Sequence, residues 1–472
     1  MAKGWVAAAA AALALVASTG PASAFTKQSL TLPMDDGVSL GATLYLPDGA
    51  MPAGGWPAIV MFHGLGDRRT ATNSWAEKYF LPGDGFAVLT FDARAHGDSG
   101  GIVTLDGPRE MADTKAVFAW LAARPDVADA KIGAWGISYG GGAVWRSTVE
   151  GVKWAAIETV ETWTDLYATL FPQDLSKSGV IAGFLSEIPE LGLSPFISSL
   201  KADALANTNL AGLRAVGRDR SSLPQLGTVS TPAFMMQGRR DFAFGIEQAK
   251  NAYAKLKGPK RLWIGDHGHP PSSFPAPDTQ AMMAEGKAWF DRFLRGVPNG
   301  IDKTPPVELS PDPWRGAPVR FAGLPPAKEA VYTLAGSQTI GRSGKVVRST
   351  APTGEALETF GAPSVRVSLK ASGGWSRLVA VLTAKTPAGK EIVVSGGGAP
   401  VRDGASTVTI RLIDQATFIP KGSTLTVTLG TSSLAQNPGN LLYLDLPLPD
   451  AAKVAVGPAT LDVPVLRTPV SR

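Results

Sequence analysis

The sequence predicts an α/β domain built on a mostly parallel sheet, followed by an all-β sandwich. In the first part of the 472-residue chain, short apolar runs alternate with helical patterns, which is typical of strands buried on both faces of a parallel sheet. Beyond residue 314, Val, Leu and Thr alternate between Gly and Pro turns, as in an antiparallel sandwich. A chain of this length with 44% hydrophobic residues can form two or three domains.

The first 24 residues are typical of a secretory signal. Lys3 precedes an apolar run over residues 6–16, and "PASA" at 21–24 resembles a cleavage site. We therefore expect a mature chain that begins at Phe25 and is secreted or periplasmic. No later run of about 18 apolar residues predicts stable membrane insertion. The chain has no cysteine, which excludes disulfides, thiolate metal sites and a cysteine nucleophile.

The first domain is predicted to span residues 25–300, with its elements in a regular order. Alternating apolar residues over 29–46 indicate an antiparallel hairpin that enters the sheet. Alternating strands and helices follow it. Strands are expected at 58–62, 86–91, 131–136, 154–160, 232–238 and 260–265, and helices at 74–81, 109–124, from 140, at 244–257 and at 279–295.

Two further segments complete the prediction. Between residues 161 and 230 the rhythm breaks into short amphipathic patterns joined by Gly, Pro and Ser, and we expect a helical lid over one end of the sheet. A linker rich in Pro and Gly covers 296–314, and the sandwich is assigned to 301–472. Its clearest strands are expected at 364–370, 377–384, 406–413 and 423–430.

Ser138 is the candidate nucleophile. It lies in "GISYG", residues 136–140, which matches the G-x-S-x-G pattern of a strained turn between a strand and a helix. Such a turn needs residues without side chains two positions before and after the serine. In isolation the motif fits a glycine-rich turn without function equally well, but the strand before it and the helix after it favour a nucleophile. No lysine follows the glycines as a phosphate-binding loop requires.

A serine hydroxyl becomes a good nucleophile when an imidazole takes its proton and a carboxylate orients that imidazole. In a strand–serine–helix site the acid and the histidine follow the serine along the chain. Of the four histidines, His63 and His96 come too early, whereas His267 and His269 come late enough. Asp241 ends the preceding strand, 28 residues before His269, and is the candidate acid.

The choice between the two late histidines stays open, with His269 preferred. Two prolines follow His269, so we expect it on a loop that reaches back over the sheet, with His267 as a hydrogen-bonded support. Asp266 and both histidines are also possible metal ligands. Zinc or iron would need further partners, and no other cluster of His or Cys supplies them. We therefore expect no metal and no cofactor.

Two backbone amides are expected to stabilise the oxyanion of an acyl-transfer intermediate. Tyr139, directly after the serine, offers one amide. Leu65 offers the other, because Gly64 and Gly66 in "HGLGD" let its amide point into the site. The alternative is that His63 and Gly64 only form a tight turn.

With these motifs in this order, the first domain resembles the α/β-hydrolase fold, and the whole mature chain resembles the X-Pro dipeptidyl-peptidase and cocaine-esterase family of serine hydrolases. "DARAHGDSGG", "GISYGG" and, in a C-terminal jelly roll, "APSVRVSL" and "FIPKGSTLTVTL" carry the resemblance. It implies Ser138 as nucleophile, Asp241 as acid and His269 as base. Two features depart from the family: "HGLGD" stands where the family often has an oxyanion-binding tyrosine, and "RAHG" replaces its usual Arg-Gly. We expect His96 to be buried and hydrogen-bonded.

The expected function is hydrolysis of a small ester, amide or peptide substrate through an acyl-enzyme. A dipeptidyl peptidase would bind a free amine with carboxylates, and an esterase would bind its acyl group with apolar side chains. A secreted binding protein with an inactive hydrolase half is the alternative of another class. The net charge of +5 is scattered and does not favour nucleic acid. Candidate lid residues for the substrate are Glu158, Glu161, Asp165 and Glu187, or Trp163, Tyr167, Phe171 and Phe184.

Overall fold

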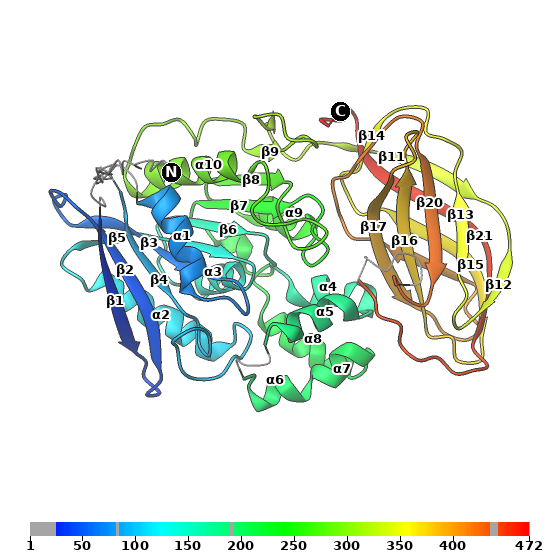
Figure 1. Ribbon diagram of the computed structural model, residues 1–472, viewed down its shortest axis with the longest axis horizontal. Helices are drawn as coiled ribbons and strands as arrows, with labels where there is room; N and C mark the ends of the chain where they lie inside the picture. The colour runs from blue at the N-terminus through cyan, green and yellow to red at the C-terminus, as the bar shows by residue number, and fades with distance from the viewer. Residues whose placement is uncertain (1–24, 82–84, 189–191, 435–441, 472) are drawn as a thin grey trace, which may run out of the picture.

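The computed structural model describes residues 25–81, 85–188, 192–434 and 442–471. The expected signal segment at 1–24 lies outside the described residues. Within them the chain forms a sheet covered by helices, a group of short helices, and an all-β domain beside them (Figure 1). The predicted fold class is confirmed.

A ten-stranded sheet organises the first domain, in the order β1-β2-β4-β3-β5-β6-β7-β8-β9-β10. From β4 to β9 each strand runs parallel to its neighbour, whereas the hairpin β1–β2 and the last strand β10 pair in antiparallel fashion. The inner strands are continuous apolar runs because both of their faces are buried. The strands are β1 (Phe25–Pro33), β2 (Ser39–Pro47), β3 (Trp56–Phe62), β4 (Ala87–Phe91), β5 (Val127–Ile137), β6 (Ile157–Val160), β7 (Ala233–Gly238), β8 (Lys260–Gly265), β9 (Val307–Leu309) and β10 (Val319–Phe321).

Helices cover both faces of this sheet. On one face α2 (Pro108–Ala122), α3 (Tyr139–Val149) and α9 (Glu247–Lys255) share a core with the strands, and on the other face α10 (Thr279–Leu294) does so. The helix expected at 74–81 is instead α1 (Arg69–Trp75) followed by a π-helical turn, η1 (Ala76–Phe80). Phe80 of that turn packs edge-to-face on Phe290 of α10 at 5.7 Å between ring centres.

The segment predicted as a lid consists of short helices, which Figure 1 shows gathered at one end of the sheet. They form a small core of their own around Tyr167, Phe171, Ile181 and Leu213. Two of the candidate substrate residues, Tyr167 and Phe171, are therefore lid core. The helices are α4 (Leu166–Leu170), η2 (Pro172–Asp174), α5 (Ser178–Ser186), α6 (Pro195–Ser199), α7 (Lys201–Ala206), α8 (Leu210–Asp219) and η3 (Leu226–Thr228).

The second domain is a sandwich of two antiparallel sheets. One has the order β11-β21-β15-β18, with β12 also paired to β21, and the other has the order β13-β20-β16-β17. Their inward residues form one apolar core. The strands are β11 (Ala327–Leu334), β12 (Gln338–Gly341), β13 (Val346–Ser349), β14 (Leu357–Glu358), β15 (Ser364–Ser372), β16 (Arg377–Lys385), β17 (Glu391–Pro400), β18 (Thr407–Arg411), β19 (Phe418–Ile419), β20 (Thr424–Gly430) and β21 (Lys453–Leu466).

The first sheet extends beyond the limit expected at residue 300. β9 and β10 lie within or beyond the segment interpreted as a linker, yet both belong to the ten-stranded sheet. β9 has three residues, all buried, and pairs with β8. β9 was not predicted from the sequence because it is short and has prolines around it, and Pro is a strong signal of irregular structure.

Candidate active site

The candidate residues lie at one edge of the parallel sheet. Ser138 follows β5, Asp241 follows β7 and His269 follows β8, and the Leu65 loop follows β3. Because these strands are parallel, their carboxyl ends meet at the same edge, where open α/β sheets bind their ligands. The topology therefore brings together segments that are far apart in the sequence.

Ser138 occupies a strained turn between β5 and α3. Its φ of 52° and ψ of −116° lie outside the regions that side-chain-bearing residues favour. The flanking glycines make the turn possible: a Cβ at Gly136 would lie 2.4 Å from the Gly140 carbonyl oxygen, and one at Gly140 would lie 2.4 Å from the Phe62 carbonyl oxygen. The Ser138 amide donates to Val160 O at 2.9 Å, which fixes the turn against β6.

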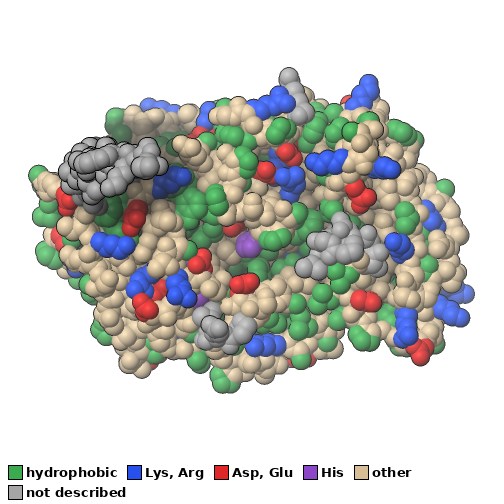
Figure 2. All heavy atoms as spheres, viewed as in Figure 1, with side chains coloured by type: hydrophobic (Ala, Val, Ile, Leu, Met, Phe, Trp, Pro, Cys, Tyr) green, Lys and Arg blue, Asp and Glu red, His purple; other side chains and the backbone are tan. Residues whose placement is uncertain are grey.

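His269 links the serine to the acid. Its Nε2 lies 2.9 Å from Ser138 Oγ, and its Nδ1 lies 2.8 Å from Asp241 Oδ2. The structure thus brings Ser138, Asp241 and His269 together with hydrogen-bond geometry suited to proton transfer from the serine. Of the four histidines, His269 alone is partly exposed, with 17% of its side chain accessible. Figure 2 shows a histidine with apolar side chains on either side near the centre of the viewed face.

The Asp241 carboxylate is fully buried and accepts several hydrogen bonds. The amides of Ala243 and Phe244 donate to Oδ1 at 2.8 and 2.9 Å, and the His269 amide donates to Oδ2 at 3.1 Å. Burial alone would raise the pKa of Asp241, but the charge of His269 and these hydrogen bonds outweigh it and lower the pKa. The acid is therefore held in its charged form.

The same interaction acts on the imidazole. Burial would lower the pKa of His269, but the charge and the hydrogen bond of Asp241 raise that pKa to about 9. The Glu161 carboxyl contributes to this increase in the pKa, and Lys177 opposes it. An imidazole with increased proton affinity is a stronger base toward the serine hydroxyl.

The loop after β3 provides a second amide near the serine. Asp67 N donates to Gly64 O at 3.2 Å, which closes a turn that places Gly66 at a φ of +78°. A Cβ at Gly64 would lie 3.9 Å from Ser138 Cβ, so the loop passes directly by the nucleophile. Among the described residues, the amides of Leu65 and Tyr139 have no hydrogen-bond acceptor. Neither predicted oxyanion donor is therefore occupied within the described residues, and the role of both amides stays a prediction.

His96 is buried and hydrogen-bonded, as expected, and it contacts this loop. Its Nδ1 lies 2.9 Å from Arg94 O, and its Nε2 accepts from Gly66 N at 3.2 Å. His63 accepts from Ala93 N at 2.9 Å. Burial lowers the pKa of both histidines, that of His96 to about 4. Two neutral imidazoles therefore fix the loop that carries Leu65.

The side chain of His267 is fully buried, and its expected role as a support stays a prediction. Burial lowers the pKa of His267, and a hydrogen bond with the Met236 backbone opposes this effect. The ring packs edge-to-face near Phe274, with ring centres 6.2 Å apart. Its neighbour Gly268 has a φ of +139°, and this turn directs the two histidines to different surroundings.

Aromatic side chains surround His269. Phe244 and Phe184 lie 5.1 and 5.9 Å from its ring centre, and Trp163 lies 5.3 Å from Phe244. These residues share an apolar cluster with Leu65 and Tyr139. Phe244 was not predicted as a site residue, because a buried apolar residue just before α9 is ordinarily part of the core.

The candidate carboxylates are dispersed. Glu158 is buried in the sheet core beside α10, and a Cβ at Gly286 would lie 2.7 Å from its Oε2. Asp165 caps α4 by accepting from Ala168 N at 3.0 Å. Glu187 lies against Gly66 of the β3 loop, where a Cβ would be 2.9 Å from its Cβ. Glu161 alone interacts electrostatically with both His269 and Asp241.

Two buried ionisable groups complete the surroundings. Glu161 has a φ of 39°, and burial raises its pKa to about 8. Lys177 of the lid donates from Nζ to the carbonyls of Phe242 and Ala243 at 2.7 and 2.6 Å, and burial lowers its pKa to about 8. Sequence reasoning did not identify Lys177, because a lysine in a loop ordinarily indicates a solvated surface.

No group of three or more His, Asp or Glu side chains is arranged to hold a metal ion in the described part of the chain. None of the helices described is at once long and apolar enough to cross a bilayer.

Residues 36–186 match the family model described as X-Pro dipeptidyl-peptidase (S15 family). The chain is 24% identical over 356 residues to cocaine esterase of Rhodococcus sp., covering 61% of this chain and 58% of that protein. It is 25% identical over 258 residues to a putative Xaa-Pro dipeptidyl-peptidase of Bacillus anthracis, covering 49% and 42%. The chain thus spans about half the length of these curated relatives.

Solved structures match over nearly the whole chain. A CocE/NonD family hydrolase from Staphylococcus aureus superposes with a TM-score of 0.70 at 13% identity and 94% coverage of each chain. An α-amino acid ester hydrolase superposes with a TM-score of 0.66 at 15% identity and 98% coverage of each chain. The comparisons confirm the predicted resemblance of this chain to the X-Pro dipeptidyl-peptidase and cocaine-esterase family of α/β-hydrolase-fold hydrolases.

Proposed function

We propose that the protein is an exported serine hydrolase that cleaves an ester or amide bond through an acyl-enzyme on Ser138. The continuous hydrogen-bonded path from Ser138 Oγ through His269 to Asp241 is the observation that carries the proposal. The family match over residues 36–186 supports it. A binding protein with an inactive hydrolase half would not need all three groups in contact.

The chemistry follows from this geometry. Ser138 Oγ attacks the substrate carbonyl carbon while His269 Nε2 takes the hydroxyl proton, and Asp241 stabilises the resulting imidazolium. The amides of Tyr139 and Leu65 donate to the oxyanion. His269 then returns the proton to the leaving alcohol or amine, and the bond to it breaks. Water then attacks the acyl carbonyl carbon while the same imidazole takes a proton from it. The bond between that carbon and Ser138 Oγ breaks, His269 returns the proton to Oγ, and the carboxylic acid leaves.

Within this chemistry we favour an ester with an apolar acyl group. Phe184, Phe244 and Trp163 cluster beside His269, and apolar walls exclude water from an acyl group and stabilise it by burial. The second candidate is an X-Pro dipeptidyl peptidase. Glu161 favours it, since this carboxyl interacts with His269 and Asp241 and could pair with a substrate amine.

The test is labelling by a fluorophosphonate, followed by a panel of substrates. Wild type should label and Ser138→Ala should not, because the reagent traps only an activated serine. Short-chain nitrophenyl esters and X-Pro anilides then separate the two candidates. Equal labelling of wild type and Ser138→Ala, or none of either, would refute the hydrolase proposal.

Export is proposed from residues 1–24, whose charged start, apolar run and small-residue site are typical of a signal peptide. Expression of the full chain in a bacterial host, with mass analysis of the protein outside the cytoplasm, should give an N-terminus at Phe25. A protein that stays in the cytoplasm with residues 1–24 attached would contradict this.

A further inference from the structure

The loop that carries Asp241 is held by the second domain as well as by its own. Ala416 N of the sandwich donates to Arg239 O at 2.8 Å, and Gln415 Nε2 donates to Asp241 O at 3.3 Å. Arg239 and Asp241 directly follow β7. The backbone carbonyls of Arg239 and Asp241 are therefore hydrogen-bonded by a segment that lies about 175 residues further along the chain.

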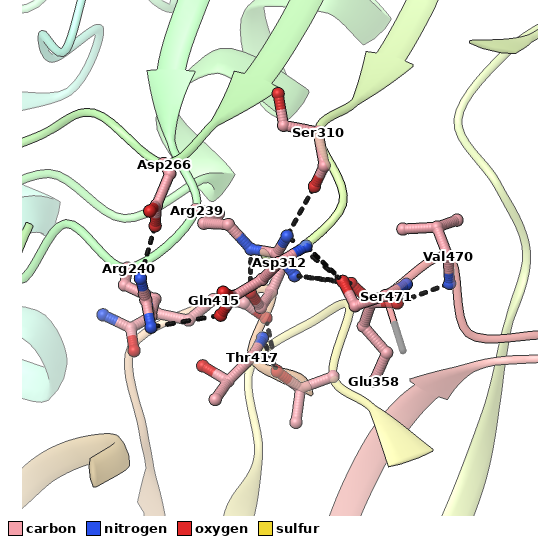
Figure 3. A network of polar contacts seen from close by, with 12 residues as sticks. Arg239, Arg240, Asp266, Ser310, Asp312, Glu358, Gln415, Thr417, Val470 and Ser471 are labelled. Atoms are coloured by element: carbon pink, nitrogen blue, oxygen red, sulfur yellow. Dashed lines mark hydrogen bonds and ion pairs between the residues drawn. The ribbon is translucent and has the colours of Figure 1, made fainter. Parts of the chain in front are cut away.

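The Arg239 side chain is the centre of this contact (Figure 3). Its guanidinium donates from Nε to Ala416 O at 2.7 Å, from Nη1 to Ser310 O at 2.5 Å, and from Nη2 to Glu358 Oε1 at 2.5 Å. The Arg239 and Glu358 side chains are both fully buried. A buried guanidinium needs an acceptor for its charge and its N–H groups, and this one has them.

Glu358, on β14, is in turn held by the end of the chain. The amides of Val470 and Ser471 donate to Oε2 at 2.6 and 3.0 Å, and Ser471 Oγ donates to Oε1 at 2.7 Å. Ser471 Oγ also accepts from the Arg239 guanidinium at 3.4 Å, so Arg239, Glu358 and Ser471 form one hydrogen-bonded network. A satisfied network of this kind is rigid, because movement of any member would leave a buried polar group without a partner.

The residues that follow the acid are held as well. Phe242 belongs to an apolar cluster formed with Leu175 of the lid and with Val379, Ile413 and Tyr443 of the second domain. The side of the loop that faces the lid is fixed by Lys177, which donates to the carbonyls of Phe242 and Ala243. From Arg239 to Ala243, polar or apolar contacts from other segments therefore fix the chain.

We propose that the sandwich positions the catalytic acid, with the buried Arg239–Glu358 pair and Gln415 acting as positioning residues for Asp241. This inference rests on the proposed function, because it assigns a role in the same reaction. The second domain is then part of the catalytic unit: it sets the distance and angle at which Asp241 meets His269 Nδ1.

Removing the charge of Glu358 should displace the loop that carries Asp241. Glu358→Gln leaves the Arg239 guanidinium buried without its counter-charge, and such a cation draws in water or shifts toward it. A displacement of about 1 Å in a catalytic group can cost about 100-fold in rate. We expect Glu358→Gln to lower kcat by about 10-fold to 100-fold, with KM within about twofold, since Glu358 does not touch the substrate.

The matched control is Glu308→Gln. Glu308 forms another buried pair, with Arg261 at 2.9 Å, and both of its members are almost fully buried; Glu285 also pairs with Arg261, and Arg320 with Glu308. The Arg261–Glu308 pair joins β8 to β9, and within the described residues no hydrogen bond or ion pair links it to residues 239–243. Both variants lose one charge from a buried pair and should lose stability, but only Glu358→Gln should change catalysis per active site.

The measurements are kcat and KM on a nitrophenyl ester, normalised to sites titrated by a fluorophosphonate, together with the pH profile of kcat/KM. A displaced Asp241 stabilises the imidazolium less, so the acidic limb of Glu358→Gln should move to lower pH than in wild type and in Glu308→Gln. Equal kcat per site and an unmoved limb in both variants would overturn the inference, even if both melt at lower temperature.

A second variant and a second measurement distinguish failure of the positioning inference from a variant that does not fold and from failure of the proposed function. If Glu358→Gln does not fold, Gln415→Ala removes a single hydrogen bond to Asp241 O, and the same shift of the limb is expected on a smaller scale. If wild type hydrolyses no substrate, the proposed function fails, and the proton NMR signal of the His269 Nδ1–H bonded to Asp241 decides the inference alone. A signal unchanged in Glu358→Gln and Gln415→Ala would refute positioning, and a displaced signal would support it.

Discussion

The protonation of His269 depends on the carboxylates beside it. Asp241 and Glu161 raise its pKa, to about 9, against the effect of burial. The base works only when it is neutral, so kcat/KM should rise with pH as the imidazolium loses its proton. The pH at which kcat/KM rises, the acidic limb of the profile, therefore reports the pKa of His269 and the effect of the Asp241 and Glu161 carboxyls on it.

Glu161→Gln should move the limb to lower pH. The change removes a carboxyl that raises the pKa of His269 and keeps the size of the side chain, so the neutral base persists to lower pH. The pH profile of kcat/KM for a neutral ester is the measurement. Glu187→Gln is the control, because Glu187 follows α5 of the lid and lies against Gly66 of the β3 loop. A limb at the same pH in Glu161→Gln and wild type would contradict this account.

The two late histidines should differ sharply. His269→Ala removes the group in contact with Ser138 Oγ and should lower kcat by about 10⁴-fold or more. His267→Ala empties a buried position without touching the serine, and should mainly lower the melting temperature. Assays at a temperature where both variants remain folded, with circular dichroism as the check, separate the effects. A greater loss of kcat in His267→Ala than in His269→Ala would show that His267, and not His269, is the base.

At the residue scale the motifs predicted Ser138, Asp241 and His269 because each stands at a strand end in a fixed order. Other groups left no such signal. Lys177 is a buried lid residue, and Glu358 is buried in the second domain, so their place near the site depends on tertiary contacts. Sequence spacing carries no information about these contacts, which join segments up to about 230 residues apart.

Among the elements, the strained turn between β5 and α3 that carries Ser138 limits which substitutions the site tolerates. Gly140→Ala should disable it, because the new Cβ would lie 2.4 Å from the Phe62 carbonyl oxygen. We expect loss of fluorophosphonate labelling by about 100-fold or more, since a shift of about 1 Å in Ser138 breaks its alignment with His269. Gly183→Ala in α5 is the control, as nothing lies within 4 Å of its Cβ. Normal labelling of Gly140→Ala would contradict the strained-turn account.

The elements that the sequence predicted well are those with long apolar runs. β15, β16 and β20 alternate Val, Leu and Thr and were located within a few residues. β17 was missed because "SGGGAP" lacks side chains to show a period, although a Cβ at Gly397 would collide with Arg411 O at 2.4 Å. β21 was missed because its prolines indicate irregular structure.

For the whole molecule, the two domains should unfold together. They share the buried Arg239–Glu358 pair and the apolar cluster of Phe242 and Ile413. Ile413→Ala should lower the free energy of unfolding by about 2–5 kcal/mol and leave a single transition. Calorimetry and loss of esterase activity measured on one sample should coincide. Two separate transitions in wild type would contradict a catalytic unit formed by both domains.

The central claim is that Ser138 forms a covalent acyl intermediate. The most direct measurement is acid quenching of the protein milliseconds after mixing with a nitrophenyl ester, followed by peptide mass spectrometry. The account predicts an acyl group on the peptide that contains Ser138, and no acyl group on this peptide in Ser138→Ala. Turnover of the ester with the acyl group on another residue, or with none on Ser138 at any time, would contradict it.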